Sequence, residues 1–246
     1  MRQDPLQVLQ AASRAIPSVA KPRLLIAGAT GTLGNEVLRR LVGASTFGET
    51  QVLAREAIKD GIRGIRTTVV PSDDPAEWPL TAADVGIVLF DPPRLFHDRE
   101  RALWTPAPQQ LPAVARWMRA SGVRTLAVVL PHAPGQLPDA LKRGLASLDE
   151  QAVAAQGFDR LLILRSAQKP AARRLANPLA RLAHWMLSIF KYMVPSSEQP
   201  VRAVKVAELL AVALRIAPAG IHVAPPELVW QASQGELGET ARRWLL

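Results

Sequence analysis

The chain of 246 residues contains no cysteine. It therefore has no disulfide framework, no thiolate nucleophile, and no zinc or iron–sulfur site held by cysteine. Its four histidines, at positions 97, 132, 184 and 222, are too far apart for the close helical spacing of a zinc site. We expect no metal centre and no catalytic cysteine.

Long apolar runs are also missing from the sequence. No stretch approaches the roughly 18 apolar residues that a membrane-spanning helix needs. Residues 1–17 interrupt their apolar positions with Asp4 and three glutamines, unlike the apolar core of a secretory signal. Together with the absence of cysteine, these features lead us to expect a cytoplasmic protein without a transmembrane segment.

Aromatic residues make up only 5% of the chain, and its net charge of +9 is unevenly distributed. Residues 165–215 hold 9 basic and 2 acidic side chains. A basic surface can bind nucleic acid, anionic lipid or an anionic cofactor. Because no recognition motif or set of stacking aromatics accompanies it, nucleic acid is not an expected partner. A solvated basic face, a protein partner and an anionic membrane surface stay open.

Apolar residues, at 48%, are numerous enough for one sizeable core. Apolar runs alternate with helical patterns, which predicts an α/β fold: a single doubly wound, Rossmann-like domain with a mainly parallel sheet. We expect an N-terminal helix and linker over residues 1–22, a nucleotide-binding core over 23–165, and a small C-terminal helical cap with its remaining elements over 166–246. The expected strands cover residues 24–27, 50–55, 65–70, 85–90, 124–130 and 159–165, with a short edge strand at 221–224.

Further helices are expected within this frame. Periodic apolar positions predict helices over residues 35–41 and 111–120, and in the last third over 171–194, 201–217 and 235–246. Residues 94–112, with three prolines, three arginines and a tryptophan, suggest an irregular crossover.

Three glycines follow the first expected strand at intervals of three residues, in the run Gly28-Ala29-Thr30-Gly31-Thr32-Leu33-Gly34. A strand before and a helix after such a run are the context of a dinucleotide-binding turn. Gly28 would make the tight turn, Gly31 would let the backbone approach a pyrophosphate, and Gly34 would allow close packing of the helix. The phosphates would lie at the helix N-terminus.

This run resembles the cofactor loop of atypical short-chain dehydrogenases/reductases, the NAD(P)H-binding, NmrA-like group. The similarity covers Arg23 to about Gln231, and the loop is its specific part. It implies cofactor contacts from the loop, namely Gly28, Thr30, Gly31, Thr32, Leu33 and Gly34. It also implies contacts near the adenine from Asp73 and at the end of the fourth strand from Phe90. A turn is the simpler role for Asp73, since Pro, Ser and Asp form turns by themselves.

The end of the second strand indicates which dinucleotide is bound. An acidic residue there bonds the ribose 2′-hydroxyl of NAD, whereas an arginine accommodates the 2′-phosphate of NADP. Arg55 stands at this point, so NADP is favoured, while the neighbouring Glu56 leaves NAD possible. The alternative is that Arg55 is an ordinary solvated residue at the end of the strand and binds no ligand. Asp91 departs from the small residue of the family, and its charge would repel a pyrophosphate unless the side chain turned away.

The catalytic residues that the resemblance implies are missing. The family uses a serine at the end of the fifth strand and a Tyr-x-x-x-Lys pair on the next helix, with the tyrosine as proton donor or acceptor. Leu130 and Pro131 stand at the serine positions, and Lys142 and Ala146 at those of the pair. The single tyrosine, Tyr192, is about fifty residues too late. We therefore assign no catalytic residue.

Two functions are compatible with these residues. The first is a dinucleotide-binding, dehydrogenase-like protein that binds or senses the cofactor without the usual carbonyl reduction. The second is a divergent NADP-dependent oxidoreductase of unknown small-molecule substrate, in which His132, Asp139 or Lys142 replaces the proton donor. The alternative for these three is that they are ordinary loop residues. The sequence leaves a protein partner and a homo-oligomer open.

Overall fold

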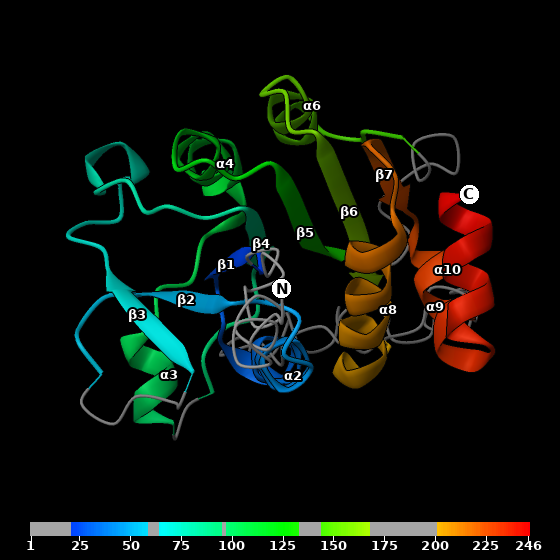
Figure 1. The fold of residues 1–246 in the computed structure, drawn as a ribbon, viewed down its shortest axis with the longest axis horizontal. Coiled ribbons are helices and arrows are strands. Elements are labelled where there is room, and N and C mark those ends of the chain that lie inside the picture. Colours follow the sequence, from blue (N-terminus) through cyan, green and yellow to red (C-terminus); the bar gives the residue numbers. More distant parts are fainter. Residues whose placement is uncertain (1–20, 59–63, 95–96, 133–143, 168–200) are drawn as a thin grey trace, which may run out of the picture.

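Seven parallel strands form one sheet in the order β3-β2-β1-β4-β5-β6-β7 in the computed structural model (Figure 1). The structure describes residues 21–58, 64–94, 97–132, 144–167 and 201–246. The order is that of a doubly wound Rossmann fold with a seventh strand, so the predicted fold class is confirmed. The strands are β1 (Arg23–Ala27), β2 (Glu49–Ala54), β3 (Ile65–Val69), β4 (Val85–Leu89), β5 (Thr125–His132), β6 (Arg160–Ala167) and β7 (Gly220–Ala224).

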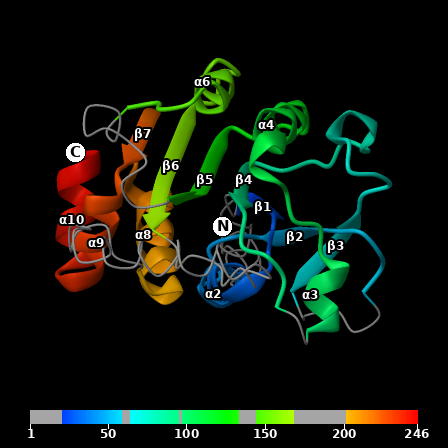
Figure 2. The same ribbon diagram turned by 180° about the vertical axis from the view of Figure 1, so that it is seen from behind.

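Helices cover both faces of the sheet (Figures 1 and 2). One face packs against α2 (Gly31–Gly43), α8 (Ala203–Ile216), α9 (Pro226–Gln234) and α10 (Leu237–Leu245). The other packs against α4 (Leu111–Ala120) and α6 (Leu148–Ala154). Central strands such as β1 and β4 are apolar on both faces, because both faces are covered. The result is two separate apolar clusters, one on each side of the sheet.

The predicted strands agree with the observed ones to within one or two residues, and β7 lies at the sheet edge as expected. Helix α2 begins at Gly31, four residues earlier than predicted. Helix α4 has the predicted bounds, and Gly122 follows it in the left-handed region at φ 96°. Helix α9 was not predicted.

Two further regions differ from the expected arrangement. The expected irregular crossover over residues 94–112 contains a helix, α3 (Asp98–Ala102), and a short 3₁₀ turn, η2 (Pro108–Gln110). Another 3₁₀ turn, η1 (Pro75–Glu77), precedes β4. In the described part of the expected cap, α8, β7, α9 and α10 extend the sheet and its helical layer. The expected N-terminal helix, which precedes residue 21, and the expected helix over residues 171–194 lie outside the described residues.

Candidate functional site

The glycine turn joins β1 to α2 at the carboxyl edge of the sheet, as predicted. Gly28 has φ 77°, and a Cβ there would lie 2.0 Å from the carbonyl oxygen of Leu89. A Cβ on Gly34 would lie 2.4 Å from the backbone carbon of Ala29. Both positions therefore require glycine for close packing of backbone against backbone. For Gly34, the close neighbour is the turn itself.

Two carboxylates of the chain lie at the N-terminus of α2. The N–H of Gly31 donates to Oε2 of Glu100 at 3.0 Å, and the N–H of Leu33 donates to Oδ2 of Asp91 at 3.0 Å. These backbone groups are the donors that a helix N-terminus offers to an anion. The side chain of Asp91 points towards the glycine turn. It bonds to the turn directly.

The space beside Gly31 is filled as well. A Cβ built on Gly31 would lie 2.7 Å from Cβ of Asp91 and 2.9 Å from the carbonyl oxygen of Pro92. Gly31, with φ 67°, therefore gives close approach to the chain's own residues. The backbone geometry suits an anion, but a pyrophosphate does not fit while the two carboxylates hold these donors.

Glu100 is buried, with 4% of its surface exposed, and is held by several donors. Nε of Arg94 donates to its Oε1 at 2.7 Å, the N–H of Arg94 donates to Oε2 at 3.0 Å, and Nδ2 of Asn35 donates to Oε1 at 2.7 Å. Burial raises the pKa of Glu100, but these bonds and that from Gly31 outweigh it and lower the pKa to about 2. Glu100 is therefore a charged group at neutral pH.

The stretch Ala102–Trp104 crosses the carboxyl ends of β1 and β2. The N–H of Gly28 donates to the carbonyl of Trp104 at 3.1 Å, and the N–H of Trp104 donates to the carbonyl of Leu53 at 2.9 Å. The N–H of Arg55 donates to the carbonyl of Ala102 at 2.8 Å. Ala54 and Leu103 form an antiparallel bridge. Backbone donors at the ends of both strands are thus bonded within the chain.

The residues expected near the adenosine also meet one another. Arg55 and Asp73 form an ion pair at 2.9 Å, although both side chains are more than half exposed. Nε1 of Trp104 donates to the same Asp73 oxygen at 2.9 Å. The bond from Trp104, followed by that from Arg55, lowers the pKa of Asp73. Asp73 therefore joins the strand end to the buried Trp104.

The remaining predicted loop residues divide into buried and exposed groups. Thr30 is fully buried, and its Oγ1 bonds to the carbonyl of Asp91 and to Oγ1 of Thr105. Leu33 and Phe90 are core residues of the two apolar clusters, whereas Thr32 is exposed. The structure thus brings the glycine turn and the Arg55–Asp73 pair to the same edge of the sheet. Phe90 packs in the cluster that also contains Trp104.

At the end of β5, the two residues expected at the serine positions, Leu130 and Pro131, carry no side-chain hydroxyl. Leu130 is half-buried, Pro131 is exposed, and His132 is 5% exposed at the last position of the strand. On α6 and just before it, the described residues contain no tyrosine. Asp139, Lys142 and Tyr192 lie outside the described residues.

A buried ion pair links β6 to α6 near this point. The guanidinium of Arg165 donates to Oε2 of Glu150 at 2.5 Å and to the carbonyl of Gly144 at 2.7 Å. Glu150 also accepts from the N–H of Ala146 at 2.7 Å. Arg165 is 2% exposed, and its hydrogen bonds hold the segment before α6 against β6.

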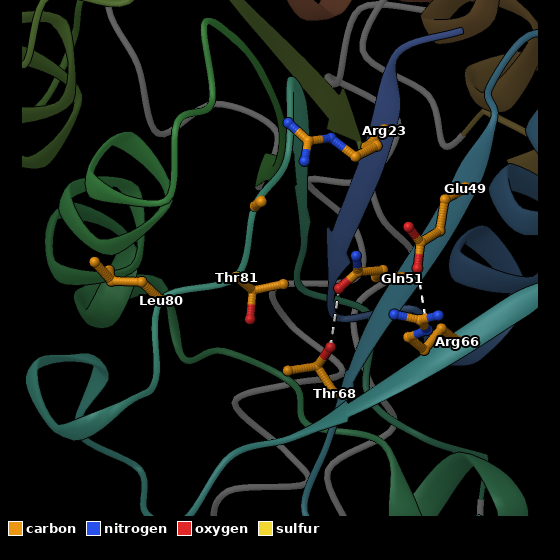
Figure 3. Close-up of a pocket in the computed structure, with 8 residues that line it drawn as sticks. Arg23, Glu49, Gln51, Arg66, Thr68, Leu80 and Thr81 are labelled. Atoms are coloured by element: carbon orange, nitrogen blue, oxygen red, sulfur yellow. Dashed lines mark hydrogen bonds and ion pairs between the residues drawn. The ribbon is translucent and has the colours of Figure 1, made fainter. Parts of the chain in front are cut away.

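A polar hollow of about 420 Å³ lies at the opposite, amino edge of the sheet (Figure 3). Its arginines are paired, Arg23 with Asp84 and Arg66 with Glu49, each at 3.1 Å. Its Gln51 accepts from Thr68 at 3.1 Å. In a parallel α/β sheet the ligand site lies at the carboxyl ends of the strands, so we do not assign the site to this hollow.

Glu100, Arg94 and Trp104 were not predicted from the sequence to lie at this edge of the sheet. Glu100 is 69 residues beyond Gly31, and its stretch has no strong periodicity that would place it at the turn. The only sequence signal was Asp91, which puts a negative charge where a small residue was expected.

Among the described residues, no helix is both long and apolar enough to cross a bilayer, and no three His, Cys, Asp or Glu side chains are grouped to hold a metal ion.

No family model matches the chain, and no curated protein matches it in sequence. Solved structures do resemble it. The enzyme WbmG of Bordetella bronchiseptica in complex with NAD has a TM-score of 0.46 and 14% identity over 90% of this chain and 81% of that one.

Two further solved structures resemble the chain. A Rossmann-fold NAD(P)-binding family protein from Shigella flexneri has a TM-score of 0.44 and 17% identity over 80% of this chain and 87% of that one. The UDP-N-acetylglucosamine 4-epimerase from Bacillus cereus has a TM-score of 0.44 and 13% identity over 86% and 82%. At TM-scores below 0.5, these likenesses carry no argument about the site or the activity of this chain.

Proposed function

We propose that this chain is a non-catalytic dinucleotide-binding protein of the dehydrogenase-like type, which takes NADP(H) at the glycine turn. The observation that carries the proposal is the anion-binding arrangement of α2, whose backbone N–H groups at Gly31 and Leu33 already hold negative charge. The anions in the structure belong to Glu100 and Asp91. Dinucleotide binding therefore requires an exchange of these carboxylates for phosphate oxygens.

The preference for NADP over NAD is part of the proposal and depends on Arg55. Its guanidinium is half exposed directly after β2 and is paired with Asp73 on the surface. An exposed ion pair is worth little, about 1 kcal/mol or less, so a 2′-phosphate can compete for the arginine. Because the acidic Glu56 follows Arg55, we expect NAD to bind as well, but more weakly than NADP.

The absence of catalysis is supported by the end of β5. Leu130 and Pro131 offer no side-chain hydrogen bond to a substrate carbonyl, and general acid catalysis is typically worth about 10²–10⁴-fold in rate. The divergent oxidoreductase remains the alternative because His132 ends β5 at the carboxyl edge. A cytoplasmic location belongs to the same proposal.

Titration calorimetry with NADPH and NADH tests the cofactor assignment. We expect NADPH to bind more tightly than NADH, and Arg55→Gln to lose most of that difference. Arg66→Gln is the matched control, because Arg66 is another exposed arginine paired with a carboxylate, on β3. Absence of binding of either nucleotide to the folded protein and its folded variants would refute the assignment. Tighter binding of NADH would refute only the role of Arg55.

The assignment of no catalysis is tested by NADPH oxidation against a panel of aldehydes, ketones and quinones. We expect no turnover above the rate without protein. Steady turnover that disappears in His132→Ala would show that the chain is an oxidoreductase.

A further inference from the structure

The N-terminus of α2 is occupied by side chains from far along the sequence. Glu100 comes from α3, and Asp91 follows β4, yet each accepts a 3.0 Å bond from a backbone N–H of the first turn of α2. Carboxylates and phosphates use the same donors at a helix N-terminus, because both are anions with several acceptor oxygens. Glu100 and Asp91, here termed the internal carboxylates, therefore resemble a bound diphosphate in charge and in donors.

Glu100, the more buried of the internal carboxylates, is surrounded by hydrogen-bond donors. Glu100 is 4% exposed and is bonded by a guanidinium, a side-chain amide and two backbone N–H groups, supplied by Arg94, Asn35 and Gly31. Bonds to a charged acceptor are roughly twice as strong as neutral ones. Breaking the hydrogen bonds of such a buried carboxylate costs free energy, and the binding of a competing ligand must offset that cost.

The same region also covers the adenosine side of the edge. Residues Ala102–Trp104 bond along the ends of β1 and β2, and Trp104 is fully buried against Trp78, with ring centroids 4.6 Å apart. The chain thus covers two parts of one site: the anion position at α2 and the strand ends beside Arg55.

We propose that the internal carboxylates are an autoinhibitory competitor of the dinucleotide, so that the chain controls its own affinity for NADP(H). This inference rests on the proposed function. A ligand whose site is open in only a fraction of the molecules binds with an apparent affinity reduced by that fraction. Neutralising Glu100 weakens the closed arrangement and leaves Arg94 as a cation for the phosphates.

The experiment compares Glu100→Gln with Glu77→Gln in titrations with NADPH and, separately, with inorganic pyrophosphate. Glu77 is the matched control because its exposed side chain is on η1 and away from the α2 donors. We expect Glu100→Gln to bind both probes at least tenfold more tightly than the wild type, and Glu77→Gln to bind as the wild type does. Asp91→Asn is a second variant with a gain in the same direction. Circular dichroism and thermal melting verify that each variant is folded.

Two outcomes overturn the inference in distinguishable ways. If the wild type binds NADPH as tightly as folded Glu100→Gln and Asp91→Asn, the internal carboxylates do not compete and the proposed function stands alone. If folded Glu100→Gln and Asp91→Asn bind neither NADPH nor pyrophosphate, the proposed function fails together with the inference.

Discussion

Glu100 is the residue that most changes the interpretation of the glycine turn. The three glycines predict a turn that approaches an anion, and the structure agrees on the backbone while supplying the anion from the chain itself. A buried charge is stable only where donors surround it, and Glu100 has them from Arg94, Asn35 and the backbone. The acid is consequently part of the folded core and, in the inference proposed above, also a competitor of the dinucleotide.

The low pKa of Glu100 predicts a dependence of stability on pH. Its pKa is about 2 when folded and 4.5 as the ordinary value, so its contribution is present above pH 4.5 and is lost as the pH falls towards 2. The linkage between proton binding and folding gives a loss of about 2 kcal/mol in the free energy of unfolding at pH 3. Urea unfolding of the wild type and Glu100→Gln between pH 6 and 3 should therefore show the stability difference shrinking. A constant difference across that range would contradict the assigned pKa.

The bond from Trp104 to Asp73 leads to a second prediction. The indole N–H of Trp104 is the leading cause of the lowered pKa of Asp73. Trp104→Phe removes this donor and keeps an aromatic ring in the cluster, so the pKa of Asp73 should rise towards its ordinary value. Titration by carbon NMR of the carboxyl group measures it. Trp230→Phe on α9 is the control and should leave the pKa of Asp73 as in the wild type.

Helix α2 shows why some glycines are required and others are not. Gly34, inside the helix, has the backbone of Ala29 2.4 Å from the position of a Cβ, whereas Gly43, at the end of the same helix, has nothing within 4 Å. The first glycine allows the helix to begin directly against the turn. The second leaves conformational freedom in the unfolded chain without a packing benefit.

Alanine at these two glycines should therefore have opposite effects. We expect Gly34→Ala to cost about 2 kcal/mol or more through overpacking against backbone. We expect Gly43→Ala to be neutral or to stabilise by about 0.5 kcal/mol. Denaturant unfolding of both variants measures the free energies of unfolding. Equal effects of the two substitutions would show that the close approach at Gly34 is not a constraint.

Prediction from the sequence succeeded for elements whose signal is local. The strands are short apolar runs between turn formers, and the glycine turn is a spacing, so both were found. Helix α3 was missed because it has only five residues within a stretch rich in proline and arginine. Asp91 was expected near the pyrophosphate from its place after the fourth strand, but the bonds of the internal carboxylates to the turn could not be found. They join Gly31 to Glu100 and Leu33 to Asp91, which are 69 and 58 positions apart.

The sheet separates two apolar clusters, and its strands contribute residues to both of them. Successive residues of a strand point to opposite faces, so Ile87 of β4 lies in the cluster with α2 and α8, and the next residue, Val88, lies in the cluster with α4 and α6. Ile163 of β6 lies in the second cluster as well. Loosening either cluster therefore weakens the same strands. The glycine turn, which follows β1 at the centre of the sheet, depends on both.

This arrangement predicts one cooperative unfolding transition with additive losses from the two faces. Ile87→Val and Ile163→Val should each cost about 0.5–1.5 kcal/mol, and the double variant should lose their sum to within about 0.5 kcal/mol. The pair Ile26→Val and Ile87→Val is the comparison, because these side chains share one face and lie opposite each other in register on β1 and β4. Their losses should deviate further from additivity. Urea unfolding followed by circular dichroism and tryptophan fluorescence measures both pairs. Separate transitions for the two probes would mean that the two faces unfold independently, and the turn would then depend on the α2 side alone.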